Sequence, residues 1–127
     1  MSAQLHWPHI RQFLRIDDTT GQVVSDYLGF SLVEDLLTPA ARATAYEEWA
    51  AFHEWHLAQR TAELATDRVK RHLVTEWTDS MTYSCRRSAA LARGENPGPW
   101  TPLRVRRPDL DAERRAIVAE LVANPNT

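Results

Sequence analysis

Between residues 39 and 93 the chain reads PAARATAYEEWAAFHEWHLAQRTAELATDRVKRHLVTEWTDSMTYSCRRSAALAR. This stretch contains no glycine, and its only proline, Pro39, stands at the very start. Proline is tolerated at the first position of a helix, and the preceding Thr38 is a good N-terminal cap. The stretch is therefore predicted to be helical from Pro39 to Arg93, just before Gly94.

One helix over all of residues 39–93 would be about 80 Å long at 1.5 Å per residue, which is too long for one compact domain. Asp67 follows Thr66 and can cap a new helix. The sequence therefore predicts a break near Thr66 and Asp67, and an antiparallel helical hairpin over residues 39–93.

The first predicted helix has one apolar face, and the indole of Trp55 lies outside it. Trp55 points to the opposite side of the helix, and Phe52 lies between Trp55 and the apolar face. An indole on the outer side has to be covered by another segment of the chain or by another molecule. The apolar face, which we predict to be core, carries Tyr46, Trp49, Ala50, His53, Leu57 and Leu64.

The second predicted helix has a stripe of apolar residues at i,i+4 spacing. Such stripes are usually buried, so we predict that Trp77, like Trp49, lies in the core. The stripe is wide enough to pack on two neighbouring elements. It comprises Val69, Leu73, Trp77, Met81 and Cys85, with Val74 and Leu91 beside it.

A linker rich in Pro, Gly and Arg, residues 94–108, leads to a further helix over residues 109–124. Asp109 is the predicted N-cap, and the Asn124-Pro125 pair is the predicted stop. One face of this helix is apolar and is predicted to close the bundle. Its residues are Leu110, Ile117, Val118 and Leu121.

The N-terminal segment, residues 1–38, has two interpretations. Residues 12–25 fit a short β-hairpin, because Asp17 to Thr20 favour a turn, Gly21 tolerates a positive φ, and β-branched valines follow. The same segment also fits two short helices, over residues 8–15 and 20–28. The predicted fold is thus mostly all-α, a single domain over residues 1–127 built on a helical hairpin, with a possible β-hairpin.

Composition limits the class of protein. With 127 residues, 43% of them hydrophobic and 25% charged, the chain is predicted to form one globular domain. Cys85 is the only cysteine, and we find no signal peptide and no long apolar run, which predicts a cytoplasmic protein with no membrane partner. Lys70 is the only lysine among 15 basic residues, a bias typical of GC-rich genomes such as those of actinobacteria and their phages.

Charge is divided unevenly along the chain. Residues 1–66 carry four arginines and nine acidic residues, a net charge of −5, whereas residues 67–127 have eleven basic and eight acidic residues, a net charge of +3. This division suits head-to-tail self-association. It also allows a basic patch of Arg104, Arg106 and Arg107, which Arg86 and Arg87 can join if the linker folds back on the second helix. Such a patch can bind phosphates or pair with acidic residues.

Catalytic and metal-binding signatures are weak. His53 and His56 are spaced i,i+3, as are His6 and His9, whereas zinc proteases need two histidines at i,i+4. Four histidines can in principle converge on one metal ion. Cys85 has arginines beside it but no His or Asp partner for nucleophilic chemistry, and His72 with Glu76 reads as a helix-surface pair.

We therefore predict a non-enzymatic protein–protein interaction module without a cofactor. It would be a small regulatory or assembly protein, encoded by an actinobacterium or a phage, that contacts itself or a larger protein through helix faces. Its predicted anchors are Trp55, Phe52, Trp7 and Trp100, because Trp7 and Trp100 stand in breaker-rich segments where aromatic side chains are often exposed. One alternative is nucleic-acid binding through the arginine cluster, and a second is a metal-dependent enzyme with a histidine site.

Overall fold

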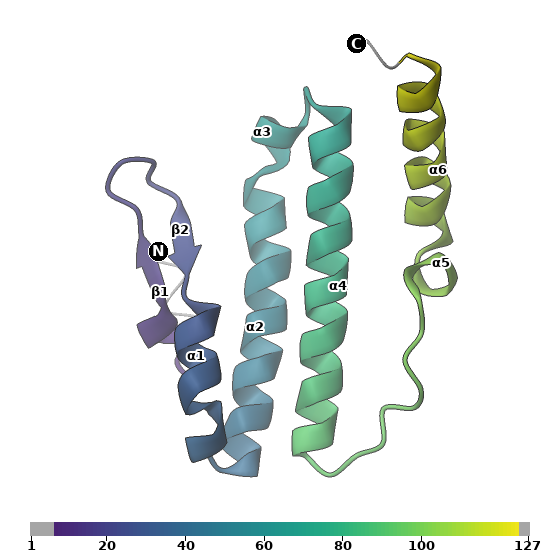
Figure 1. Ribbon diagram of the computed structural model, residues 1–127. Helices are drawn as coiled ribbons and strands as arrows, with labels where there is room; N and C mark the ends of the chain where they lie inside the picture. Colours follow the sequence, from purple (N-terminus) through teal and green to yellow (C-terminus); the bar gives the residue numbers. More distant parts are fainter. Residues whose placement is uncertain (1–6, 125–127) are drawn as a thin grey trace.

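A computed structural model describes residues 7–124 of the protein. Its centre is an antiparallel pair of long helices, α2 (Pro39–Gln59) and α4 (Arg68–Ala92), joined by the single-turn helix α3 (Thr61–Leu64). The β-hairpin and α1 lie on one side of this pair, next to α2, and α6 lies on the other side, next to α4 (Figure 1). The predicted fold class, a helical hairpin with a C-terminal helix and a short β-hairpin, is confirmed.

The caps of the two long helices follow the sequence. The hydroxyl of Thr38 accepts a hydrogen bond from the backbone N–H of Ala41 at 3.2 Å. The carboxylate of Asp67 accepts one from the backbone N–H of Lys70 at 3.0 Å. The chain therefore turns where predicted, between α3 and α4.

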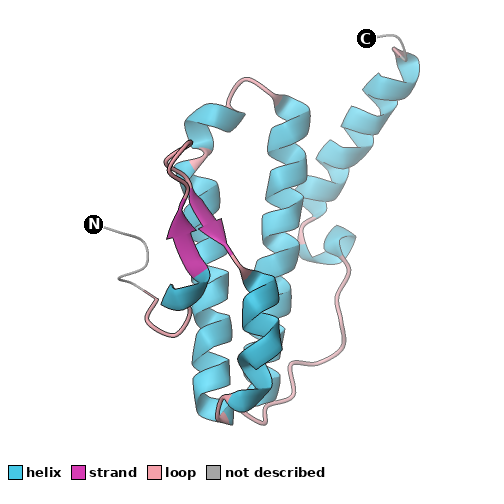
Figure 2. Ribbon diagram, turned by 60° about the vertical axis from the view of Figure 1, so that its left-hand side comes forward, coloured by secondary structure: helices cyan, strands magenta, loops and turns pink. Residues whose placement is uncertain are grey.

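The N-terminal segment is a β-hairpin, so the two-helix interpretation is wrong. Strands β1 (Leu14–Ile16) and β2 (Val23–Ser25) pair antiparallel, with Leu14 opposite Ser25 and Ile16 opposite Val23 (Figure 2). The carboxylate of Asp17 accepts hydrogen bonds from the backbone N–H groups of Thr19 and Thr20, and Gly21 closes the loop at φ 72°. These turn contacts fix the register.

Short helical segments flank the hairpin. The 3₁₀ turn η2 (Arg11–Phe13) precedes β1, and α1 (Tyr27–Val33) and the 3₁₀ turn η3 (Glu34–Leu36) follow β2. Asp26 caps α1 through the backbone N–H of Gly29 at 2.8 Å.

The core lies between this N-terminal segment and the two long helices. The predicted face of α2 is buried at Tyr46, Trp49, Ala50 and His53, which confirms that face. Phe30 of α1 packs its ring against Tyr46 and Trp49 at centroid distances of 5.6 and 5.7 Å.

The predicted core face of α4 is wrong. Only Cys85 of the i,i+4 stripe is buried, and Trp77 is 55% exposed. The helix instead turns small side chains toward α2, which lets the bulky rings of α2 fit between the two helices. These small residues are Thr78, Thr82, Cys85 and Ala89.

The linker contains a short helix, α5 (Leu103–Arg106), that the sequence analysis did not predict. Helix α6 (Pro108–Ala123) starts one residue before Asp109, and Asp109 pairs with Arg107 instead of capping the helix. Leu110 and Ile117 are buried, whereas Val118 and Leu121 are exposed, so only part of the predicted apolar face is covered.

Candidate binding surfaces

Trp7 and Phe52 do not form an exposed contact surface. Trp7 is 7% exposed and packs edge-on against Phe52 and Trp55, at centroid distances of 5.8 and 5.7 Å. Trp55 is half-buried and packs against the core. The N-terminal segment of the chain itself therefore covers the indole that faces away from α4. This corrects the expectation that Trp55, Phe52 and Trp7 are exposed anchors.

Trp100, the fourth predicted anchor, is exposed as expected. Its ring meets Tyr83 of α4 edge-on at 4.6 Å, and the backbone N–H of the next residue, Thr101, donates a hydrogen bond to the Tyr83 hydroxyl at 2.8 Å. Trp100 thus holds the linker against α4, which accounts for this aromatic residue without a partner protein.

The linker folds back on α4, and four of the five predicted arginines line one hollow of about 340 Å³. The guanidinium of Arg106 lies 3.9 Å from the ring centroid of Tyr83 and donates to Asp79 at 2.6 Å. Arg107 pairs with Asp79 at 3.5 Å and with Asp109 at 2.9 Å, and the Asp109 contact raises the pKa of Arg107 above its usual range.

The other arginines of the cluster behave differently. Arg87 donates to the carbonyl oxygens of Pro97, Gly98 and Pro99, and Arg86 pairs with Glu54 of α2. Arg104 lies on α5 and is exposed. Internal acceptors therefore occupy Arg86, Arg87, Arg106 and Arg107. The contacts of Arg87, Arg106 and Arg107 attach the linker to α4, whereas Arg86 joins α4 to α2.

A buried histidine joins α6 to α4. His72 is 3% exposed, its Nδ1 lies 2.6 Å from Glu113 of α6, and its Nε2 contacts Glu76. The predicted pair of His72 and Glu76 exists, but it is buried rather than on the surface.

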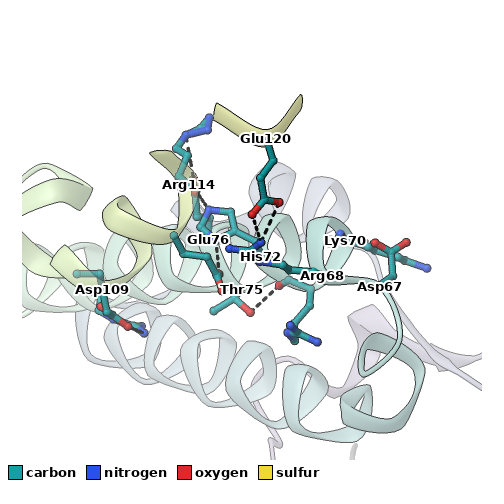
Figure 3. A network of polar contacts seen from close by, with 12 residues as sticks. Asp67, Arg68, Lys70, His72, Thr75, Glu76, Asp109, Arg114 and Glu120 are labelled. Carbon is teal, nitrogen blue, oxygen red and sulfur yellow. Dashed lines mark hydrogen bonds and ion pairs between the residues drawn. The ribbon is translucent and has the colours of Figure 1, made fainter. Parts of the chain in front are cut away.

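Two further ion pairs, one exposed and one partly buried, flank this histidine (Figure 3). Arg114 of α6 reaches Glu76 at 3.7 Å, and Glu120 of α6 accepts two hydrogen bonds from Arg68 at 2.7 and 2.9 Å. Since exposed pairs contribute little, His72 is the main polar contact between the two helices.

Between residues 7 and 124 no group of three or more His, Cys, Asp or Glu side chains is arranged to hold a metal ion. His9 is bound to Glu48, with its Nδ1 at 2.6 Å from the carboxylate, and His6 lies outside the described residues. The Cys85 thiol is buried, and burial raises its pKa to about 11, which keeps it protonated and unreactive.

Besides Leu73, Trp77 and Leu91 of α4, two helix faces leave large apolar side chains in solvent. The leucine stripe consists of Leu28, Leu32 and Leu36 on α1 and η3, which are 80%, 84% and 84% exposed. Their i,i+4 spacing aligns them along one side of this segment. Residues 26–37 include three acidic residues and no basic one.

The second of these faces belongs to α6. An open depression there is lined by Arg114, Arg115, Val118, Ala119, Val122 and Ala123, and we call this surface the α6 face. Val118 and Val122 are 51% and 75% exposed. Among the described residues, the ion pair of Arg115 is with Asp111 of its own helix, at 2.9 Å.

Comparisons with known proteins do not assign the chain to a family. No family model, no curated protein and no solved structure matches the chain. Within the part of the chain that the structure describes, we find no helix both long enough and apolar enough to cross a membrane.

Neither the leucine stripe nor the α6 face was predicted from the sequence. Leu28, Leu32 and Leu36 already stand at helical spacing in the sequence, but the hairpin and helix interpretations of residues 12–28 obscured the pattern. On α6, Val118 was assigned to the core because nothing local shows how far α4 extends beside that helix.

Proposed function

We propose that this protein is a non-enzymatic interaction module, a small regulatory or assembly protein that joins copies of itself head to tail. The leucine stripe of one copy would dock on the α6 face of the next. The observation that carries the proposal is the exposure of Leu28, Leu32 and Leu36, each at least 80% exposed on one side of a short helical segment. Exposed apolar patches of this kind mark interaction sites.

Charge favours the α6 face as the surface that covers the stripe. Asp26 and Asp35 are exposed beside the leucines, and Arg42, the nearest arginine in sequence, already donates to the carbonyl oxygens of Glu34 and Leu37. The fitting partner is therefore an apolar helix face bordered by cations. The α6 face has this chemistry, because the exposed Val118 and Val122 line the same depression as Arg114 and Arg115.

The division of charge along the chain supports the same arrangement. The stripe lies in the acidic half and the α6 face in the basic half. A contact between two different surfaces leaves one free surface of each kind on every dimer, so assembly continues until a ring closes or a filament forms.

We propose that the protein acts in the cytoplasm. Its single cysteine is buried and free, as is usual in a reducing compartment. An actinobacterial or phage origin is supported only by the preference for arginine over lysine. Nucleic-acid binding through the arginine cluster and metal-dependent catalysis at a histidine site stay predictions. Among the described residues, no contact favours either of these functions over self-assembly.

Sedimentation velocity across a wide range of protein concentration tests the proposal. The wild-type protein should shift to larger species as concentration rises. Leu32→Glu should stay monomeric, because it puts a charge in the centre of the stripe. Leu91→Glu is the matched control, since Leu91 is an exposed leucine of α4 outside both surfaces. A wild type that is monomeric throughout, or equal dissociation by both variants, would overturn the proposal.

A further inference from the structure

The hollow between α4 and the linker has a strongly positive lining, and we call it the arginine hollow. Its volume is about 340 Å³, and among the described residues Asp79 is the one acid that lines it. Four guanidinium groups held around one hollow raise the local positive potential, which attracts anions. These cations are Arg86 and Arg87 of α4, Arg106 of α5, and Arg107 at the junction of α5 and α6.

Carboxylates compensate the charge of the arginine hollow only in part. Three of its four arginines pair with an acid, which is Glu54, Asp79 or Asp109. The acceptors of Arg87 are instead the backbone carbonyl oxygens of residues 97–99, which carry no formal charge. One positive charge is therefore left over among these residues, even when the acids outside the lining are counted.

Arg86 has hydrogen-bond donors that a ligand can reach. A guanidinium carries five N–H groups in a planar fork. The contact of Arg86 with Glu54 uses Nη2, and among the described residues its Nε and Nη1 have no acceptor. The Arg86 side chain is 51% exposed, and that of Arg107 is 40% exposed. An anion can therefore approach both side chains while Arg106 stays packed on the ring of Tyr83.

The surroundings favour a small ligand over a nucleic-acid chain. Glu54 and Asp109, the acids that pair with Arg86 and Arg107, are more than half exposed. They would repel a polyanion laid across this surface. The volume of the hollow is at the lower end of the range for small-molecule sites, which suits one anionic group with a small organic group attached.

We infer that the arginine hollow binds a small phosphate monoester, with Arg86 and Arg107 as the main hydrogen-bond donors. A phosphate monoester has three terminal oxygens and a charge of about −1.5 to −2 near pH 7, so it can accept from several guanidinium groups at once. A carboxylate has two oxygens and one charge. The leucine stripe and the α6 face contribute no residue to this hollow, so the inference stands apart from self-assembly.

The probes are phenyl phosphate and benzoate, which share an aromatic ring and differ in the anionic group. Titration of the wild-type protein with phenyl phosphate near pH 7 in low-salt buffer, followed by NMR, should give saturable shifts of the Nε–H signals of Arg86 and Arg107. Benzoate should bind more weakly, because it brings less charge and fewer acceptor oxygens to the guanidinium groups.

Substitution of single arginines locates the site. Arg86→Gln should weaken phenyl phosphate binding about tenfold, the loss expected for one hydrogen bond to a charged group. Arg68→Gln is the matched control and should leave binding unchanged, because Arg68 is an exposed arginine of α4 that pairs with Glu120 outside the hollow. If Arg86→Gln does not fold, Arg107→Gln takes its place.

Three results would overturn this inference. The first is the absence of a saturable shift with phenyl phosphate. The second is benzoate binding as tight as that of phenyl phosphate. The third is an equal effect of Arg86→Gln and Arg68→Gln on phenyl phosphate binding, since that would show a general attraction of anions to the protein.

Discussion

His53 couples the stability of the fold to pH. Its pKa is lowered from 6.5 to about 4 in the folded protein, mainly by burial, whereas in the unfolded chain the ring titrates near 6.5. Between these values the unfolded state binds more protons, so this contribution to stability is complete above pH 6.5 and is lost as pH falls toward 4. The loss is at most about 3 kcal/mol.

Urea unfolding of the wild type and of His53→Leu at several pH values measures this contribution. We expect the wild type to lose more stability than the variant between pH 6.5 and pH 4. At pH 7 the variant should be at least as stable as the wild type, because leucine removes an unpaired buried polar group. Parallel stability profiles for the two proteins would show that His53 is not held neutral by the fold.

Trp7 and Trp100 test the distinction between a core indole and an exposed one. Trp7→Ala removes a ring that covers Phe52 and Trp55 and should cost about 3–5 kcal/mol of unfolding free energy. Trp100→Ala removes an exposed ring that contacts Tyr83 and should cost about 1 kcal/mol. Denaturant midpoints of the two variants make the comparison, and equal costs would contradict the assignment of Trp7 to the core.

At the scale of elements, His72 determines how firmly α6 stays on α4. Glu113→Ala removes a carboxylate from this buried ring, and Glu120→Ala removes one from an exposed arginine. In hydrogen–deuterium exchange, amides of α6 should exchange about tenfold faster in Glu113→Ala and nearly as in wild type in Glu120→Ala. If the two variants loosen α6 equally, the contact of His72 with Glu113 does not hold the helix.

Helix ends could be predicted from the sequence because their signals are local. Thr38 and Asp67 cap the backbone three residues ahead, and Gly21 supplies the positive φ of its own loop. Each of these contacts depends on a few neighbouring residues.

The buried face of α4 could not be predicted in the same way. Trp77 and Thr78 are adjacent, and the smaller residue is the buried one because the rings of α2 already fill the interface. The contact of Trp7 with Trp55 joins residues that are 48 positions apart in the sequence. A pattern of neighbouring residues cannot predict such a contact. The prediction that Trp7, Phe52 and Trp55 are exposed anchors failed for this reason, because tertiary packing sets the neighbours of these side chains.

At the scale of the whole molecule, the protein consists of a well-packed half and a sparsely covered half. The N-terminal segment and α2 share an aromatic core, whereas α6 contacts the rest of the chain mainly through the neighbouring α5 and through α4. Exposed apolar faces remain on α1 and on α6, at opposite sides of the helical pair (Figure 1). This arrangement suits growth in one direction, with each copy covering the apolar face of the next.

Mixing two variants that are each blocked on one surface tests self-assembly most directly. Leu32→Glu disables the leucine stripe and Val118→Glu disables the α6 face, so each variant alone should be monomeric in light scattering. An equimolar mixture retains one intact surface of each kind, and we predict a heterodimer of twice the monomer mass that grows no further. A mixture that remains monomeric, with both variants folded, would contradict head-to-tail assembly.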